Sequence, residues 1–273
     1  MGTDYVHGYT TDESRRLTDQ AKTLADLLHA GTTYPPGARV LEVGCGVGAQ
    51  TVQLVTASPG IRLVSVDLSE DSLAQAKARV AAAAPYADVE WHLGDLRDLP
   101  FEDGSFDHLF VCFVLEHLSD PEQVLRKLRR LVRPGGDITV IEGDHGSAFH
   151  HPRSAAAQSL IDCLTELQAE AGGDALIGRR VQPLLQAAGY HDVRTRPCTV
   201  YADETLPHLV DGFTRKTFIA MVESVRERAL ATGLRTPEQW RRGIRDLERA
   251  AEPGGTFHYT FFKAVALIPE GAG

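Results

Sequence analysis

Short apolar runs alternate with amphipathic stretches along the first half of the chain. Four runs, at residues 40–43, 61–66, 108–112 and 137–142, have the length and composition of strands in a buried parallel sheet, and a short strand is predicted at 89–93. The stretches between them place apolar residues at helical spacing, as Val124, Leu128 and Leu131 do at i, i+4 and i+7. This alternation predicts an α/β domain with a doubly wound sheet.

Helical patterns flank this alternation on both sides. Residues 1–36 are predicted to form an N-terminal helical lid, because Thr10 and Glu13 have capping-box spacing and Pro35 and Pro36 would stop the helix. Helices are predicted near residues 154–170 and 178–188, and the last two strands at residues 193–201 and 256–267. Residues 203–255 are too long for a hairpin and have helical periodicity, which predicts a helical cap. The predicted parts are therefore lid (1–36), core (37–202), cap (203–255) and final strand with tail (256–273).

A glycine-rich turn follows the first predicted strand, with one acid before it and another at the end of the second strand. These residues are Glu42, Gly44, Cys45, Gly46, Gly48 and Asp67. Glycine allows main-chain N–H groups to approach a ligand, and a carboxylate at a strand end suits a ribose diol. The pattern predicts a nucleoside site. The turn also fits the G-x-G-x-x-G/A pattern of NAD enzymes, but Glu42 would repel a pyrophosphate and can hold a cationic amino-acid group.

Three later segments fall in a recognisable order. Gly94, Asp95 and Leu96 follow the third strand, residues 99–107 lead into the fourth, and the Arg-Pro-Gly-Gly sequence at 133–136 precedes the fifth. With the acid-x-Gly-x-Gly-x-Gly turn, residues 40–142 resemble the class I S-adenosylmethionine (SAM) dependent methyltransferases. The nearest branch is the single-domain bacterial one that modifies quinones, sterol-like lipids and natural products.

The resemblance implies a Rossmann-like seven-stranded sheet whose C-terminal strands form an antiparallel pair. It also implies SAM as the methyl donor, released as S-adenosylhomocysteine, with an adenine-binding turn at Asp95. The cofactor-binding residues that it implies are Glu42, Gly44, Cys45, Gly46, Gly48, Asp67, Leu68, Gly94, Asp95, Leu96 and Phe113.

Candidate catalytic residues lie after the fourth and fifth strands, where open α/β sheets bind ligands. Methyl transfer from a sulfonium requires a nucleophile held in line, and it requires a base only when the attacking atom carries a proton. Glu116 and His117 form one acid–histidine pair, and His145 with Glu142 or Asp144 forms another. In the family, the histidine after the fourth strand often only lines the SAM pocket, so both interpretations of Glu116 and His117 remain open.

One tyrosine completes the candidate catalytic residues, and two further histidines raise the question of a metal site. Tyr9 precedes the first helix, where a tyrosine in this family can contact the donor or the acceptor. The predicted catalytic residues are therefore His117, Glu116, His145 and Tyr9. The spacing of His145, His150 and His151 matches no zinc pattern, so no metal site is predicted.

The composition of the chain limits the kinds of molecule that it is expected to bind. A net charge of −9 disfavours a nucleic acid partner, and Phe-Val-Leu-Glu stands at 113–116, where base N-methyltransferases carry Asn/Asp-Pro-Pro-aromatic. No apolar run has the length of a membrane helix, and the chain starts with no secretory signal pattern. Four widely spaced cysteines without a CxxC motif fit reduced thiols in a cytoplasmic protein.

The predicted acceptor is an apolar aromatic small molecule, with an indole-type ring methylated on carbon or nitrogen as the specific hypothesis. The aromatic residues expected at its entrance are Tyr9, Phe113, Phe149, Phe213 and Trp240. Trp240 also fits a plain core position. The cap helices are a candidate surface for a homodimer. The alternatives are a nucleic-acid or protein methyltransferase, a non-catalytic SAM-binding module and an NAD oxidoreductase.

Overall fold

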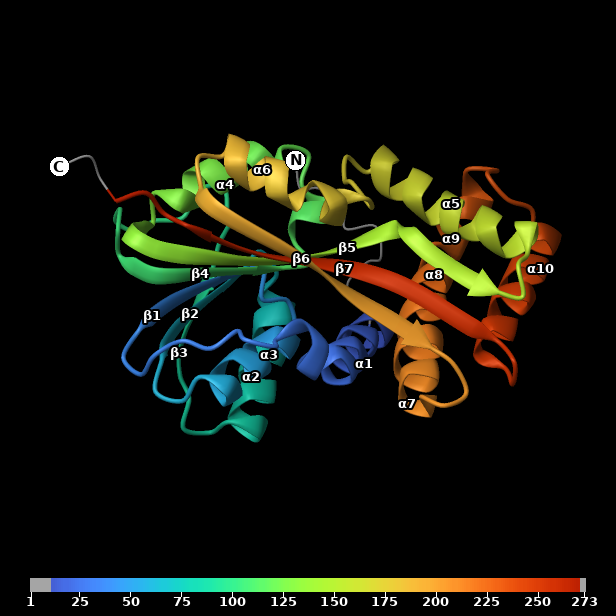
Figure 1. Ribbon diagram of the computed structural model, residues 1–273, viewed down its shortest axis with the longest axis horizontal. Helices are drawn as coiled ribbons and strands as arrows, with labels where there is room; N and C mark the ends of the chain where they lie inside the picture. The colour runs from blue at the N-terminus through green and yellow to red at the C-terminus, as the bar shows by residue number, and fades with distance from the viewer. Residues whose placement is uncertain (1–10, 271–273) are drawn as a thin grey trace.

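The computed structural model describes residues 11–270 and contains one mixed β-sheet with helices on both faces (Figure 1). The strands are β1 (Arg39–Val43), β2 (Arg62–Asp67), β3 (Asp88–Leu93), β4 (Phe106–Cys112), β5 (Val132–His151), β6 (His191–Ala202) and β7 (Thr256–Leu267). Their order is β3-β2-β1-β4-β5-β7-β6. β1 to β5 pair in parallel, and β7 runs antiparallel to both β5 and β6. The Rossmann-like seven-stranded sheet is therefore confirmed.

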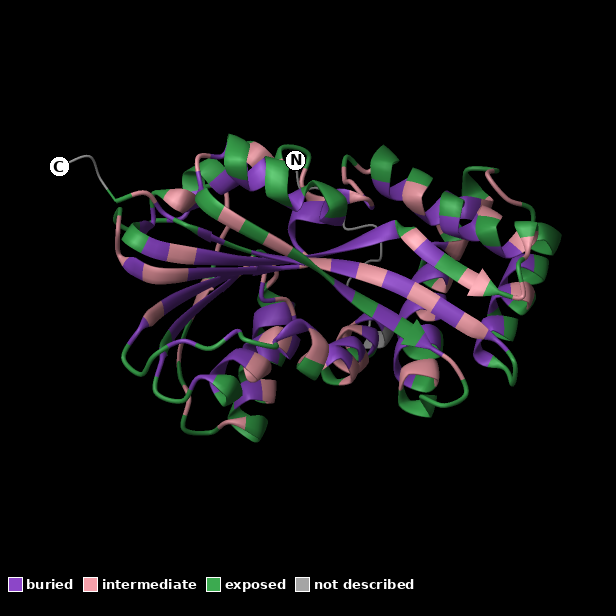
Figure 2. Cartoon of the chain, viewed as in Figure 1, coloured by how far each residue is buried: buried purple, intermediate pink, exposed green. Residues whose placement is uncertain are grey.

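The helices of the parallel half form a layer on each face of the sheet. α1 (Thr11–Leu28), α2 (Ala49–Ala57) and α3 (Glu70–Ala83) cover one face, and α4 (Pro121–Arg129) and α6 (Val181–Ala187) cover the other (Figure 1). Strand alternation sets the two cores: Leu109 of β4 packs in one hydrophobic cluster and Phe110 in the other. Figure 2 shows that the inner parallel strands are largely buried, while the two edge strands β3 and β6 are exposed or half-buried along much of their length.

The start of β5 differs from the sequence prediction. The residues at 133–136 were expected to end a helix ahead of a strand at 137–142, whereas β5 begins at Val132 and includes them. The pairing with β4 jumps from Val132 to Asp137, so the Pro-Gly-Gly segment is a bulge inside the strand. β5 also continues to His151 because β7 supplies an antiparallel partner well beyond the parallel half.

Long strands β5, β6 and β7 extend past the parallel half and carry the remaining helices (Figure 1). α5 (Ala155–Glu170) begins at its N-cap Ser154 and is followed by the short η2 (Ile177–Arg180). Between β6 and β7 lie α7 (Pro207–Leu209), the π-helical η3 (Val210–Ile219), α8 (Ala220–Ser224), α9 (Arg226–Ala231), α10 (Pro237–Glu248) and η4 (Arg249–Ala251). The segment at 203–255 is thus helical as predicted. Its role as a separate cap and as a dimer surface stays a prediction.

Packing holds this helical segment against the rest of the chain. At Gly243 of α10, an added Cβ would collide with Leu160 of α5, so the two helices lie in close contact. Thr236 and Gln239 form a capping box that starts α10. Across residues 11–270, no helix combines the length and the apolar character needed to cross a membrane.

Candidate functional site

A cavity of about 220 Å³ lies at the carboxyl ends of β1, β2 and β4. The glycine turn after β1 forms its floor, Asp67 of β2 stands at one side, and Phe113 after β4 stands at another. Helix α1 closes it with Glu13, Ser14, Leu17 and Gln20. The location is the ligand-binding edge of an open parallel sheet. We call this space the donor cavity.

Each glycine of the turn has a positive φ, between 52° and 76°. An added Cβ would strike Val114 at Gly44 and Ala76 at Gly48, so these two glycines allow close packing of the turn. Gly46 is different, because its Cβ position is open space beside the cavity. The main chain at Gly46 is therefore accessible to a ligand.

Asp67 connects the turn to the next helix. Its carboxylate accepts hydrogen bonds from the N–H groups of Gly46 at 2.7 Å and Ser69 at 2.9 Å. Burial raises the pKa of Asp67, and these N–H donors oppose that rise. The two bonds leave lone pairs on both oxygens, so the carboxylate can still accept from hydroxyls of a bound nucleoside.

Glu42 lies behind the turn and is not among the side chains that line the donor cavity. It is 2% exposed, and its Oε2 accepts from the hydroxyls of Thr51 and Ser65, both at 2.7 Å. Burial raises the pKa of Glu42 to about 7, against the effect of those two donors. Glu42 therefore connects β1 to α2 and β2 behind the turn.

The other predicted cofactor residues divide into two groups. Cys45, Leu96 and Phe113 line the donor cavity, whereas Gly48, Leu68, Gly94 and Asp95 do not. Asp95 forms a bidentate ion pair with Arg97, which lowers the pKa of the Asp95 carboxyl. Leu68 is exposed beyond the end of β2. An adenine contact at Asp95 stays a prediction.

A second cavity of about 50 Å³ adjoins the donor cavity. The two share four lining residues, Leu17, Gln20, Phe113 and His117. The walls of the second cavity are mainly aromatic or apolar and come from β7, η3 and α8: Phe213, Phe218, Met221, Tyr259 and Phe261. Its polar lining is Arg16, Gln20, Glu116, His117, His145 and Thr217. We call this space the acceptor cavity.

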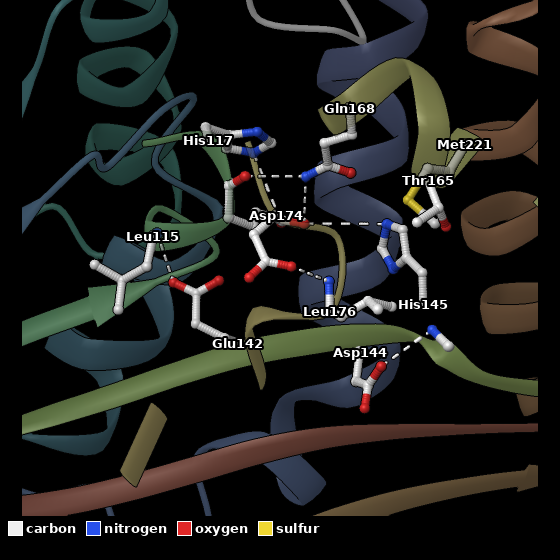
Figure 3. A network of polar contacts seen from close by, with 12 residues as sticks. Leu115, His117, Glu142, Asp144, His145, Thr165, Gln168, Asp174, Leu176 and Met221 are labelled. Carbon is white, nitrogen blue, oxygen red and sulfur yellow. Dashed lines mark hydrogen bonds and ion pairs between the residues drawn. The ribbon is translucent and has the colours of Figure 1, made fainter. Parts of the chain in front are cut away.

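A buried carboxylate lies between two histidines in the wall of the acceptor cavity. Glu116 Oε1 is 3.6 Å from His117 Nε2, and Glu116 Oε2 is 4.0 Å from His145 Nε2. Gln168 of α5 donates to Glu116 Oε2 at 3.1 Å and to its carbonyl at 3.2 Å. His117, Gln168 and His145 converge on this point from three different elements (Figure 3). The predicted residues Glu116, His117 and His145 are thus brought together.

Burial and charge set the protonation of this cluster. Burial lowers the pKa of both His117 and His145, and Glu116 opposes that effect without reversing it. Burial by itself raises the pKa of Glu116, but His117, His145 and the Gln168 donor outweigh it, so its pKa lies below the ordinary value. Near neutral pH the cluster therefore holds one carboxylate and two neutral imidazoles.

The partners expected for His145 were wrong. Asp144 forms a bidentate ion pair with Arg179, and Glu142 accepts from the main-chain N–H groups of Val114 and Leu115. The strand explains this result, because neighbouring side chains point to opposite faces of β5. His145 instead contacts Tyr259, whose hydroxyl lies 2.7 Å from Nδ1.

Three aromatic predictions also need correction or lie outside the structure. Phe149 is 59% exposed, stacks on His258 and lines neither cavity. Trp240 is 1% exposed and donates to Glu223, so it belongs to the core. Tyr9 lies outside the described residues. Within residues 11–270, no group of three or more His, Cys, Asp or Glu side chains is arranged to hold a metal ion.

Sequence reasoning missed Tyr259, Phe218 and Gln168. One signal was available for part of this set: Phe257, Tyr259 and Phe261 alternate along β7, which indicates one aromatic face of a strand. Gln168 and Phe218 carry no comparable signal, because their place depends on how α5 and η3 pack.

Residues 41–140 match the family described as "Methyltransferase domain". A protein of transposon TN4556 from Streptomyces fradiae is 32% identical over 219 residues, which are 79% of this chain and 59% of that protein. The 27-O-demethylrifamycin SV methyltransferase of Amycolatopsis mediterranei is 31% identical over 51% of each chain. The chain therefore spans between half and three fifths of these relatives' lengths.

Solved structures show the same fold. A phosphoethanolamine N-methyltransferase of Haemonchus contortus, in complex with SAM, superposes with a TM-score of 0.58 at 18% identity, covering 97% of this chain and 58% of that one. The match to the methyltransferase domain thus covers residues 41–140, and the likeness to this solved structure covers the fold of nearly the whole chain.

Proposed function

We propose that the protein is a SAM-dependent methyltransferase that acts on a small, largely apolar acceptor. The observation that carries this proposal is the pairing of the two cavities across Leu17, Gln20, Phe113 and His117. A donor on one side of this boundary and an acceptor on the other would bring the methyl carbon and its nucleophile into contact, and positioning is the main requirement of such a displacement.

The donor cavity has features that fit SAM. The open main chain at Gly46 suits an amino-acid group, the carboxylate of Asp67 suits a ribose diol, and the apolar Leu96 suits a purine. When bound, SAM supplies an electrophilic methyl group on a sulfonium. The residues around it hold the donor and exclude bulk water.

The acceptor cavity supports the proposed acceptor class. Its walls are formed by Phe213, Phe218 and Phe261, which favour a ring or another flat apolar group. The Glu116, His117 and His145 cluster would accept a proton when the nucleophile carries one. The sequence predicts an indole-type ring methylated on carbon or nitrogen, and the contacts of His145 and Glu116 favour a hydroxyl group on the ring instead.

Calorimetric titration with S-adenosylhomocysteine, with NAD as the comparator, tests the donor assignment. We expect micromolar binding of S-adenosylhomocysteine, no binding of NAD, and at least about a tenfold loss in Asp67→Ala, which removes a charged hydrogen-bond acceptor. Asp88→Ala is the matched control. This exposed acid starts β3, so it lies at the amino ends of the parallel strands, whereas the donor cavity lies at their carboxyl ends. Binding of NAD, or equal binding by Asp67→Ala and wild type, would contradict the assignment.

A further inference from the structure

The environment of His145 determines which of its ring nitrogens carries the proton. His145 is 4% exposed, and its Nδ1 lies 2.7 Å from the hydroxyl of Tyr259. Its Nε2 has no hydrogen-bond partner among residues 11–270 and faces the acceptor cavity, 4.0 Å from Glu116 Oε2. A neutral imidazole has one donor and one acceptor nitrogen, so the Tyr259 contact decides the role of both.

The phenol must be the donor in this contact. Tyr259 is 2% exposed, and in the described part of the chain His145 Nδ1 is the only side-chain partner of its hydroxyl. The main-chain N–H of Asp144 also acts on the phenol oxygen, and as a donor it leaves the phenol proton for Nδ1. If Nδ1 donated instead, the phenol proton would be buried without an acceptor.

Gly143 makes this contact possible. An added Cβ at Gly143 would collide with the Tyr259 hydroxyl, so the missing side chain leaves the space that the hydroxyl occupies beside β5. Burial also raises the pKa of Tyr259 well above its ordinary value, which keeps the phenol protonated and able to donate.

We propose that Tyr259 is a positioning residue that keeps the proton of neutral His145 on Nε2, so that the acceptor cavity presents an N–H donor beside the Glu116 carboxylate. This pair recognises a hydroxyl group, because a hydroxyl accepts from His145 and donates to Glu116 at the same time. A ring N–H can only donate, and it would leave the His145 N–H buried without an acceptor. The hydroxyl assignment rests on the proposed methyltransferase function.

The assignment gives the two residues different roles in transfer. Glu116 takes the hydroxyl proton as the acceptor oxygen forms its bond to the methyl carbon. The electron pair of the broken carbon–sulfur bond stays on sulfur, which becomes a neutral thioether. His145 donates to the same oxygen and orients it, without accepting a proton.

Nitrogen NMR of uniformly ¹⁵N-labelled protein tests the role of Tyr259 without any substrate. We expect the wild-type His145 signals, assigned by their loss in His145→Gln, to show an unprotonated Nδ1 and a protonated Nε2. In Tyr259→Phe the form protonated on Nδ1 should become populated. Tyr190→Phe is the matched control, since that buried hydroxyl donates to the Leu125 carbonyl elsewhere in the fold. A wild-type His145 protonated on Nδ1, or identical spectra for Tyr259→Phe and wild type, would overturn the proposal.

Methylation assays with SAM test the hydroxyl assignment on two flat ring systems, 1-naphthol and indole. We expect kcat/KM for 1-naphthol to exceed that for indole by about a hundredfold or more. Glu116→Gln should reduce kcat by about a hundredfold or more, while His145→Gln, which keeps an N–H donor, should retain more activity than Glu116→Gln.

The other possible results contradict different parts of the argument. Methylation of indole in preference to 1-naphthol, or equal losses in His145→Gln and Glu116→Gln, overturns the hydroxyl assignment. Bound S-adenosylhomocysteine with neither ring methylated also overturns it, while the NMR result still decides the role of Tyr259. Absence of S-adenosylhomocysteine binding removes the proposed function instead.

Discussion

Glu42 shows how a buried carboxyl can support a ligand site without reaching it. The residue is held by Thr51 and Ser65 under the glycine turn, and the turn is held from the other side by Asp67. Asp67 also adds to the rise in the pKa of Glu42. The folded protein keeps a proton on Glu42 up to a pH near 7.

This proton makes stability depend on pH in a definite direction. The pKa of Glu42 is raised from an ordinary 4.5 to about 7, so its contribution to stability is complete below pH 4.5 and is lost as the pH rises through 7. We expect the free energy of unfolding of wild type, relative to Glu42→Gln, to fall by about 3 kcal/mol between pH 4 and pH 8. Urea denaturation across this range measures the difference.

Glu90→Gln provides the control for this experiment, because Glu90 is an exposed carboxyl on the edge strand β3 of the same sheet. The free energy of unfolding of Glu90→Gln should change with pH as that of wild type does across the same range. If the free energy of unfolding of Glu42→Gln also changes with pH as that of wild type does, the folded protein holds no proton on Glu42.

Single residues were predictable where local chemistry decides their place. Gly44 and Asp67 could be assigned from the sequence, because a positive φ and a strand end are local properties. The partners of His145 could not, because Tyr259 lies 114 positions away and reaches it only through the antiparallel pairing of β5 and β7. Asp144 was the nearer acid in sequence, yet Arg179 binds it.

At the scale of elements, the end of α1 depends on one buried lysine of β7. Lys263 is 3% exposed, and its ammonium donates to the carbonyls of Leu28 and Ala30, both at 3.0 Å, and to the hydroxyl of Thr32. The last carbonyls of a helix lack partners within the helix, and a cation there also interacts favourably with the helix dipole. Lys263 therefore fixes α1 to the sheet.

Removing this lysine should loosen the helix that closes both cavities. In Lys263→Met the carbonyls lose their donors, and we expect the free energy of unfolding to fall by about 1–3 kcal/mol, with faster amide hydrogen exchange at the end of α1. Lys127→Met is the control, since Lys127 donates to a single carbonyl, that of Arg97, at the exposed surface. If the free energy of unfolding falls equally in the two variants, the buried hydrogen bonds of Lys263 stabilise the fold no more than the exposed one of Lys127.

The elements themselves followed the sequence pattern closely, with one informative exception. The apolar runs predicted the inner strands of the parallel half, because a parallel strand buried on both faces needs a continuous apolar segment. The start of β5 was misplaced because Pro134, Gly135 and Gly136 have the composition of a turn, although pairing with β4 and β7 carries the strand across them as a bulge. Long-range pairing outweighed the local preference there.

At the scale of the whole molecule, α1 links the two cavities physically. Leu17 and Gln20 line both spaces, and on its other side α1 packs against η3, which lines only the acceptor cavity. The contact is close at Gly212, where an added Cβ would collide with Thr23. A ligand that holds α1 in place in the donor cavity therefore also holds η3.

This linkage predicts a response to the donor product that extends beyond the residues it touches. We expect saturating S-adenosylhomocysteine to slow amide hydrogen exchange in α1 and also in η3 (Val210–Ile219), because ordering of one helix reduces the opening of the helix packed on it. In Gly212→Ala the close contact with Thr23 is lost, so protection should stay in α1 and disappear from η3 while S-adenosylhomocysteine still binds. Protection confined to the donor cavity in wild type would show that the two cavities open independently. Protection of η3 in both proteins would show that the linkage follows the sheet and not the contact between α1 and η3.

Coupling of this kind is reciprocal. If the donor raises the affinity for an acceptor in the second cavity by some factor, the acceptor should raise the affinity for the donor by that same factor.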